Sequence, residues 1–554
     1  MDILDLFLEI LFEKKLEIAI AIITIFYTTK FLKLVHKIYQ SNKLLSNIST
    51  NQAFPAKLFG FYQPHPKLER WALFRKLAEA EADADAEGTS EGSSGLSKFY
   101  ILPFTPILIV SKSDPAETIL KSTIHVNKND IINKVVNSMV GCNLFSATNE
   151  TWKNKRRILA KTMHRDLHFG YGEAINKHVI GMVDVIKGEI SGPSSSSRSA
   201  NIKFSDLEQN CSLNILADNI FGQKIKNEAQ RSKFLSCFDK NIEFLELRIS
   251  NPLLVNDTIW SAYCFWKGID YKKIREDGVE IIVEMIKSRM EILKSRSEDQ
   301  VDQKNQKETL VIDVLLKLYN QKLITFDEII AEATMFFVAA LDTTTHATIG
   351  GVYGLSHPSC RDAQEKLINE IDKFFPDKSD LENFQLEILD SMPYLDAVVR
   401  ESLRYRTGSL IGRSASEKIV FDLKNSSEKI EINASKTNPV NFILNFRAIS
   451  DSKMLKTYPN NPEELRKFRP DRFFNKEIDT NSYAYLPFSR GPRDCVGQAF
   501  AYLSMKIQFI QLYRNFRTEI LVENDEDKRI DRECILNFTY QFKVQPVIRF
   551  IERD

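Results

Sequence analysis

Apolar and polar residues follow two different spacings along the chain. From about residue 200 to 405, apolar residues recur every three or four positions, which predicts a series of helices. The longest of these segments covers 325–357, and Thr325 and Glu328 have the spacing of a capping box at its start. Another segment with helical spacing predicts a helix over 497–515.

Shorter segments have the composition of strands. FYILPFTPILIV (99–110) is rich in β-branched and aromatic residues around a proline turn, so it predicts a strand pair, with a helix following at 113–121. Alternating runs predict more strands between 415 and 450, and residues 535–550 predict a closing hairpin. Since no repeat of 20–50 residues is present, we expect a mainly α fold with a minor β portion, of the α+β class.

Two polar segments interrupt these patterns. Residues 78–95 begin as an acidic, alanine-rich run and end in glycine and serine, which predicts a solvated surface loop. Residues 191–200, SGPSSSSRSA, predict a flexible break between two helices. We interpret both as surface insertions in one folded domain that covers residues 41–554.

An uncharged apolar run near the N-terminus predicts attachment to a membrane. The run IAIAIITIFYTT (18–29) follows acidic residues, unlike a secretory signal. Lysines follow it from Lys30 onward, so the positive-inside rule places the rest of the chain in the cytosol. We expect residues 1–40 to form a single-pass anchor. Because a span needs about 20 apolar residues, the alternative is a buried N-terminal helix or an amphipathic helix on the bilayer.

Composition excludes several classes of protein. With 43% hydrophobic and 27% charged residues, the 554-residue chain is neither disordered nor collagen-like. Lys and Arg (75) balance Asp and Glu (74), so the net charge of +1 gives no reason to expect nucleic acid as a partner. The seven cysteines include no CxxC pair, which argues against a disulfide scaffold or zinc site and favours a reducing compartment.

One cysteine lies in a distinctive motif within PFSRGPRDCVGQAF. Its pattern, F-x-x-G-x-R-x-C-x-G, is formed by Phe488, Gly491, Arg493, Cys495 and Gly497. A thiolate ligand needs electropositive surroundings, which a fixed cation and the free N–H groups at the start of the following helix provide. The glycines let the backbone approach a flat ligand closely. The motif therefore predicts that Cys495 ligates a metal.

With this motif the sequence resembles the cytochrome P450 family of haem-thiolate monooxygenases, over nearly the whole chain after the N-terminal run. The resemblance implies haem b (iron protoporphyrin IX) held by the Cys495 thiolate, with Phe488 and Gly497 beside it. Trp152 and Arg156 match the family's W-x-x-x-R helix, where one turn separates two side chains that reach the same haem propionate. Arg493 is expected at the other propionate, and Arg413 is a further candidate.

A third family motif lies between the predicted central helix and the cysteine. Glu401 and Arg404 match the family's E-x-x-R helix. The segment FRPDRF (468–473) would supply either Arg472 or Arg469 to close a buried ion network with that pair. The resemblance implies a structural role for this network around the cysteine loop.

AALDTTTHA (339–347) resembles the oxygen-binding kink of the family's central helix, with Ala340 in place of the usual glycine. The resemblance implies that Asp342 and Thr343 are the catalytic residues, which deliver protons while the O–O bond is cleaved. A hydroxyl that bonds a carbonyl one turn back also bends the helix and makes room for oxygen and water. We interpret His346, just beyond, as a helix-face residue.

The resemblance implies insertion of one oxygen atom from O2 into a hydrophobic small molecule. No nucleotide fingerprint is found, so electrons from NADPH must come through a partner, expected to be NADPH–cytochrome P450 reductase, with cytochrome b5 as a second candidate. Residues 152–165 carry six cations and no acid, which suits an acidic reductase or describes only a solvated basic helix. We expect contact with membrane lipid and a location in the endoplasmic reticulum membrane.

Two other functions stay open. One is a haem-thiolate isomerase or dehydratase that acts on hydroperoxides without external electrons; the pair Asp342 and Thr343 argues against it. The other is a non-catalytic haem-binding membrane protein, which would have no use for a proton-delivering pair beside the iron.

Overall fold

The computed structural model describes residues 94–553 with short gaps, together with scattered positions between 25 and 45. The gaps are 103–104, 126, 164–167, 193–197, 300–309, 383–384, 407–409, 423–428, 458–461, 466, 521–533, 537–539 and 543–544. Most of the predicted insertion at 78–95, the centre of the one at 191–200 and the first part of the expected anchor lie outside the described residues.

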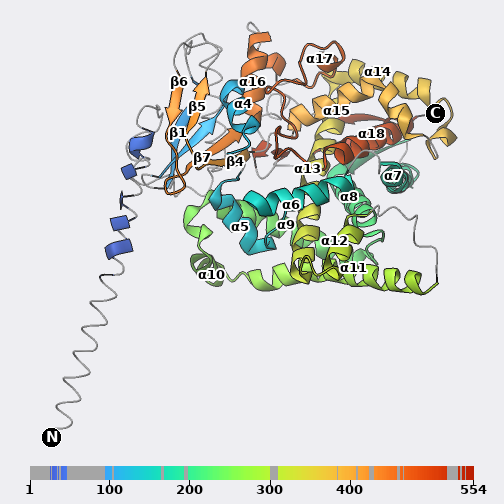
Figure 1. Cartoon of the computed structure of the whole chain (residues 1–554). Helices are drawn as coiled ribbons and strands as arrows, with labels where there is room; N and C mark the ends of the chain where they lie inside the picture. The colour runs from blue at the N-terminus through green and yellow to red at the C-terminus, as the bar shows by residue number, and fades with distance from the viewer. Residues whose placement is uncertain are drawn as a thin grey trace, which may run out of the picture.

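Helices make up most of the described chain, which confirms the mainly α fold with a minor β portion (Figure 1). The helices are α4 (Ser113–Lys121), α5 (Asp130–Val140), α6 (Asn149–Leu159), α7 (His168–Ile190), α8 (Phe204–Phe221), α9 (Glu228–Ser250), α10 (Asp257–Trp266), α11 (Tyr271–Asp299), α12 (Val311–Asn320), α13 (Phe326–Ser356), α14 (Arg361–Phe374), α15 (Pro393–Arg406), α16 (Phe446–Thr457), α17 (Asp471–Phe474) and α18 (Gln498–Asn515).

The strands form small sheets, the largest with the order β1-β2-β7-β4. Within it β2 and β7 are parallel, and the other neighbours are antiparallel. The strands of this sheet are β1 (Leu96–Leu102), β2 (Thr105–Val110), β4 (Leu410–Ala415) and β7 (Val440–Asn445). The other pairings are β3 (Ser199–Lys203) and β8 (Phe516–Ile520) on either side of β11 (Val547–Glu552), β5 (Ile419–Asp422) with β6 (Lys429–Ile432), and β9 (Cys534–Leu536) with β10 (Tyr540–Phe542).

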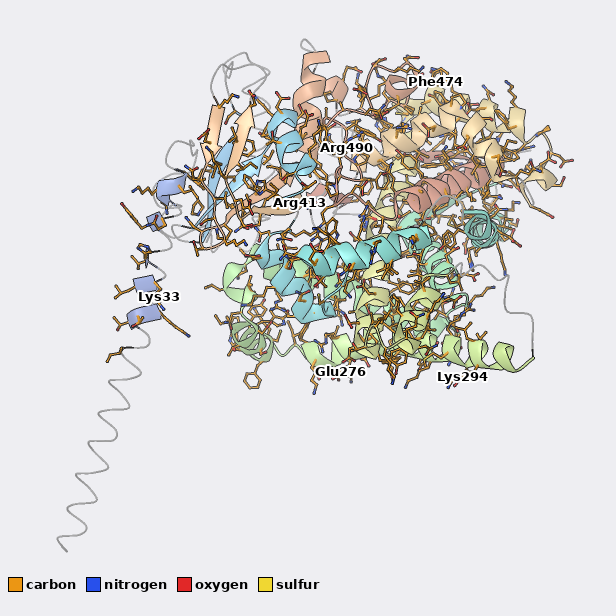
Figure 2. All side chains as sticks on the ribbon, in the orientation of Figure 1. Lys33, Glu276, Lys294, Arg413, Phe474 and Arg490 are labelled. Carbon is orange, nitrogen blue, oxygen red and sulfur yellow. The ribbon has the colours of Figure 1, made fainter. Side chains whose placement is uncertain are left out.

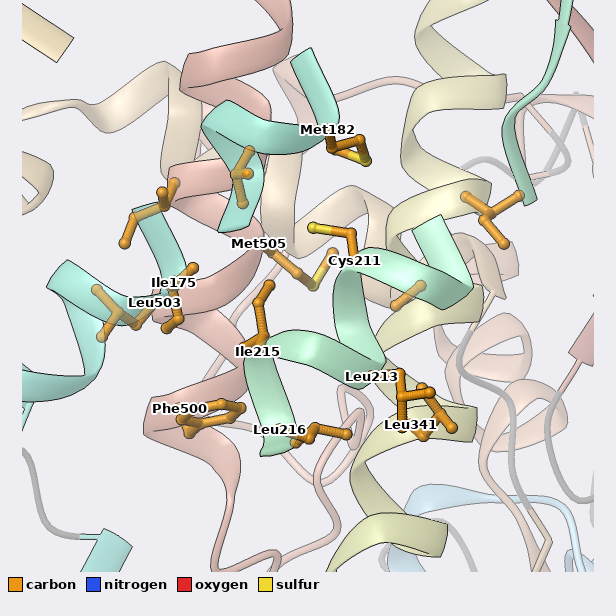
Figure 3. Packing of buried hydrophobic residues seen from close by; sticks show 14 of the residues in the cluster. Ile175, Met182, Cys211, Leu213, Ile215, Leu216, Leu341, Phe500, Leu503 and Met505 are labelled. Carbon is orange, nitrogen blue, oxygen red and sulfur yellow. The ribbon is translucent and has the colours of Figure 1, made fainter. Parts of the chain in front are cut away.

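Helix α13 runs through the middle of the helical part and packs against α8 and α15, while the largest sheet lies to one side with α4 and α16 (Figure 1). Its N-terminus has the predicted capping box, because Thr325 Oγ1 accepts from Glu328 N–H and Glu328 accepts from Thr325 N–H. The main hydrophobic core surrounds this helix. Figure 3 shows part of that core, where Leu216 of α8 lies near Phe500 of α18.

Most predicted elements are present, and two differ. The strand pair at 99–110, the helix at 113–121 and the strands between 415 and 450 are confirmed. Strand β4 was not predicted. It forms by pairing with β7, a strand further along the chain. The closing hairpin is wrong in part, because β9 pairs with β10 but β11 pairs with β3 and β8.

The N-terminal positions that are described include apolar side chains that face outward. Ile25, Leu32 and Tyr39 are each at least 60% exposed, whereas Leu45 is buried against the sheet and its carbonyl accepts a hydrogen bond from Lys98 Nζ at 2.8 Å. In the described portion of the chain, we find no helix with the length and apolar character that crossing a bilayer requires.

One buried carboxyl makes the stability of the fold depend on pH. Glu208 of α8 is fully buried and accepts a hydrogen bond from Ser212 Oγ at 2.7 Å. Burial raises the pKa of Glu208 to about 8, and hydrogen bonds from Ser212 and Gln508 oppose the rise. The carboxyl is therefore protonated in the folded protein at a pH where the unfolded chain ionises it.

We expect the protein to lose stability as the pH rises from about 4.5 through 8, because ionisation of Glu208 favours unfolding. Glu208→Gln should remove this slope and raise the free energy of unfolding at pH 8.5 by about 5 kcal/mol. Urea unfolding at several pH values measures it, with the exposed Glu243→Gln as the control. An unchanged slope in Glu208→Gln would contradict the assignment.

Candidate active site

A cavity of about 340 Å³ lies between α5, α6, α9, α13 and the loop before α18. Residues expected at a haem site gather around it. Those that line the cavity are Trp152, Arg156, Thr343, Phe488, Arg493, Cys495 and Gly497. The expected residues Asp342 and Arg413 are not among the lining residues, although Gly412 beside Arg413 is.

The loop that carries Cys495 holds its thiol at the cavity wall. The Cys495 N–H donates to the Phe488 carbonyl at 3.0 Å, which closes the loop on itself, and the side chain of Cys495 is open to the cavity. Burial within the protein raises the pKa of the Cys495 thiol, while the Gly497 N–H and the nearby cations Arg156 and Lys128 oppose the rise. Burial outweighs the positive surroundings, so a bound metal ion is what would hold the sulfur as a thiolate.

Gly491 has a different role from the one its place in the motif suggested. Its φ is +81°, a left-handed conformation that side chains rarely adopt. A Cβ on this residue would lie 1.9 Å from the carbonyl oxygen of Leu120, the penultimate residue of α4. Glycine is therefore required here by the turn and by the end of α4 rather than by a flat ligand.

Four cations gather on one side of the cavity, and they have few acidic partners. The Arg493 guanidinium stacks on Trp152, with its carbon 4.2 Å from the ring centroid, and Nη2 donates to the Ala147 carbonyl at 2.6 Å. Burial and the neighbouring Arg413 lower the pKa of Arg493 to about 9, and burial lowers that of Arg413 to about 10. Arg413 belongs to β4, an edge strand of the largest sheet, and lies on the side of α6 in Figure 2.

The fourth cation, Lys128, was not predicted from the sequence. Its side chain is buried and its ammonium lies over the Phe145 ring. Burial, Arg413 and Arg493 lower its pKa well below the ordinary value, whereas the Cys495 thiolate form would raise it. Lys128 stands just before the N-cap of α5 and no motif marks it. Only the tertiary structure brings it to the cavity.

These cations fit the carboxylates of haem. Within the described part of the chain, Arg493 Nε and Nη1 are buried and make no hydrogen bond. Burying charge without a counter-ion is costly, so this cluster suits an anionic ligand, as the two propionates of haem are. Arg156 is the cation of this cluster that is least available to a propionate. Its guanidinium pairs with the Asp494 carboxylate and also donates to the Asp494 carbonyl at 2.5 Å.

Helix α13 brings the expected catalytic threonine to the cavity but turns the acid away. Thr343 Oγ1 donates to the Ala339 carbonyl at 2.7 Å, one turn back, as expected for a bent oxygen-binding helix. Ala340 also lines the cavity. Asp342 is buried on another face of α13, where it faces His346.

The E-x-x-R helix takes part in a buried ion network. Arg404 donates from Nε and Nη2 to both oxygens of Glu401, at 2.7 and 2.9 Å. Of the two candidates, Arg472 closes the network, with Nε 3.2 Å from Glu401 Oε1. Arg469 contributes its backbone N–H at 2.7 Å, while its side chain pairs with Glu477.

Several cations of the basic segment at 152–165 form ion pairs within the protein, so fewer of them are available to a partner than its sequence suggested. Lys155 is mostly buried and bonds Glu332 at 2.8 Å and Glu328 at 3.4 Å, both from α13. Lys153 pairs with Glu150 at 2.7 Å. Among the described residues of this segment, Lys153, Lys155 and Arg156 therefore have acidic partners that lie outside it.

Comparison with known proteins connects this site to a family. The family model described as Cytochrome P450 matches residues 98–546. Similar proteins include cytochrome P450 4c21 of Blattella germanica, 23% identical over 436 residues (78% of this chain, 81% of that protein). Probable cytochrome P450 4ac2 of Drosophila melanogaster is 25% identical over 468 residues (83% and 84%), and cytochrome P450 4V2 of Mus musculus is 25% identical over 441 residues (77% and 78%). The chain therefore belongs to the cytochrome P450 family of haem-thiolate monooxygenases.

Proposed function

We propose that this chain inserts one oxygen atom from O2 into a hydrophobic small molecule, with electrons that NADPH supplies through a partner reductase. The observation that carries the proposal is the cavity, which brings apolar walls, the Cys495 thiol and the Thr343 hydroxyl to one space. Side chains such as Leu245, Met335 and Phe336 would bind a substrate mainly by removing its apolar surface from water.

Haem held by a cysteine thiolate supplies the activation of O2 and favours cleavage of the O–O bond. The residues of this chain would hold it from three sides. Cys495 would ligate the iron, Phe488 would border the ring, and the propionates would bind the group of cations described above. Trp152 would support that group, since it is buried beneath Arg493.

Thr343 and Asp342 would manage protons for this reaction. Because the Thr343 hydroxyl donates to the Ala339 carbonyl, its oxygen is free to accept a hydrogen bond from a water molecule in the cavity. Such a water would be held where protons are needed. Asp342 would have to turn toward the cavity to supply them, since its carboxylate faces His346.

The electron donor would be NADPH–cytochrome P450 reductase, with cytochrome b5 as a second candidate. Arg157 and Lys161 are exposed near the end of α6, close in the chain to Arg156 at the cavity wall. They support docking of an acidic partner at this end. Lys155 does not belong to that surface, since Glu332 neutralises it.

We also propose that residues 1–40 attach the protein to the endoplasmic reticulum membrane as a single-pass anchor, with residues 41–554 as one catalytic domain in the cytosol. The support is the uncharged run at 18–29 and the lysines that follow it.

The experiment that tests the proposed function compares Thr343→Ala with Thr345→Ala in the presence of reductase. Thr345 is buried on the same helix, and its hydroxyl makes no hydrogen bond within the described chain. We expect Thr343→Ala to keep haem binding and NADPH consumption. Loss of a positioned proton-transfer group typically slows the step it serves ~10²–10⁴-fold. Product per NADPH, which depends only in part on that step, should fall about tenfold, and hydrogen peroxide should rise. Thr345→Ala should stay near the wild type.

Two results would contradict the proposal. One is a wild-type ratio of product to NADPH in Thr343→Ala. The other is a wild-type protein that converts a hydroperoxide but never consumes NADPH with any reductase, since that result would favour the isomerase.

A further inference from the structure

His346 lies between solvent and the buried acid of α13. It stands one helical turn beyond Asp342, with Nδ1 2.6 Å from the Asp342 carbonyl oxygen and 3.5 Å from Asp342 Oδ1. The side chain of Asp342 is 1% exposed, whereas that of His346 is 16% exposed. His346 therefore contacts the buried carboxylate on one side and reaches water on another.

Acidic side chains from two other helices face the same region. Asp239 of α9 receives a hydrogen bond at Oδ1 from Gln209 Nε2 of α8, at 3.0 Å. Partial burial raises the pKa of Asp239, while Gln209 and the nearby charge of His346 lower it. Asp206 of α8 adds negative charge, although Lys203 pairs with it at 3.0 Å. His346 therefore lies near two acids, Asp342 on α13 and Asp239 on α9.

The hydrogen bond to the carbonyl assigns a role to each ring nitrogen. Nδ1 must carry a hydrogen to donate to the Asp342 carbonyl, so Nε2 is the nitrogen that can take up a proton. The ring that results carries both protons and a positive charge. It becomes neutral again when it releases the Nδ1 proton to Asp342 Oδ1, so that one proton has moved from water to the carboxylate.

We propose that His346 is the residue through which protons from solvent reach Asp342. This inference rests on the proposed function, in which Asp342 and Thr343 supply protons to the cavity. The charge of Asp239 interacts with that of His346, and Asp342 would turn toward the cavity beside Thr343 to pass the proton on. His346 is not among the residues that line the cavity, so it acts through Asp342 and touches neither substrate nor iron.

The test compares His346→Gln with His178→Gln in the holoenzyme with its reductase. Glutamine can still donate toward the Asp342 carbonyl but cannot carry a proton through its side chain. His178 is a matched control, because its Nε2 lies 3.0 Å from Asp218 Oδ2 in a histidine–aspartate pair between α7 and α8. Product, NADPH consumption and hydrogen peroxide are measured in water and in deuterium oxide.

We expect His346→Gln to lower product per NADPH roughly tenfold and to increase the solvent isotope effect on product formation, since proton supply becomes limiting. The matched variant His178→Gln should keep the coupling and the isotope effect of the wild type. Haem content and the unfolding midpoint should not change, which separates a proton relay from a structural role.

Three other results would count against the relay or call for a second variant. If His346→Gln and His178→Gln give the same coupling and the same solvent isotope effect, the relay is overturned. If His346→Gln fails to retain haem, Asp239→Asn is used, which should lower coupling about twofold by removing one nearby charge; unchanged coupling there overturns the relay. If the wild type forms no product with NADPH and reductase, the proposed function fails, and the relay fails with it.

Discussion

Replacing Cys495 with serine should abolish the red-shifted Soret band of the ferrous–CO complex and remove product formation altogether. The Cys495 side chain is open to the cavity, and the Gly497 N–H faces its sulfur, so this thiol is placed to bind the iron of haem. A hydroxyl in the same position is a far weaker donor to iron, and it does not supply the electron density that thiolate ligation gives. The measurement is a reduced CO difference spectrum together with haem content.

Cys142→Ser is the matched control for this experiment. Cys142 is free and exposed, and it lies between α5 and α6 rather than at the cavity. We expect its spectrum and activity to match those of the wild type. A thiolate-type CO band that persists in Cys495→Ser would show that another residue ligates the iron.

The second large effect is expected from Glu401→Gln. Glu401 is fully buried and accepts hydrogen bonds from Arg404, from Arg472 and from the Arg469 N–H. Without its charge, two buried guanidinium groups lose their counter-ion. Breaking a buried ion pair typically costs about 3–5 kcal/mol, so the unfolding free energy should fall by that amount and haem should be lost at lower temperature.

The control for Glu401→Gln lies at the edge of the same network. Glu477 pairs with the side chain of Arg469, and both are partly exposed, so Glu477→Gln should cost less than about 1 kcal/mol. Denaturant unfolding and haem release on heating measure both variants. Equal losses in the two variants would mean that burial of the charges does not set the strength of this network.

The sequence predicted correctly those elements that depend on residues within one short segment. The capping box of α13 needs only Thr325 and Glu328, and the strand pair β1–β2 needs only two adjacent apolar runs. The same holds for the cysteine loop, where motif spacing placed Cys495 at the cavity wall and where neighbouring residues form the turn. These features depend on contacts between residues that are close in the chain.

Features that depend on distant partners could not be predicted in this way. Lys128 is an ordinary lysine in the sequence, and its burial follows from β4 and the cysteine loop, which come hundreds of residues later. The sequence placed Lys155 on a basic face open to a partner or to solvent. Its actual partner, Glu332, lies far ahead in the chain and could not be identified from the local pattern. The burial of Asp342 likewise could not be predicted, because it arises where α8 and other distant segments pack against α13.

The contact between Gly491 and Leu120 limits how relatives of this protein can be recombined. No side chain fits at position 491 while the end of α4 is in place, because its Cβ would overlap the carbonyl oxygen of Leu120. A chimaera that takes α4 from one parent and the cysteine loop from another must reproduce this contact to within a fraction of an ångström. Crossover points should therefore keep the two segments from the same parent, although they lie about 370 positions apart.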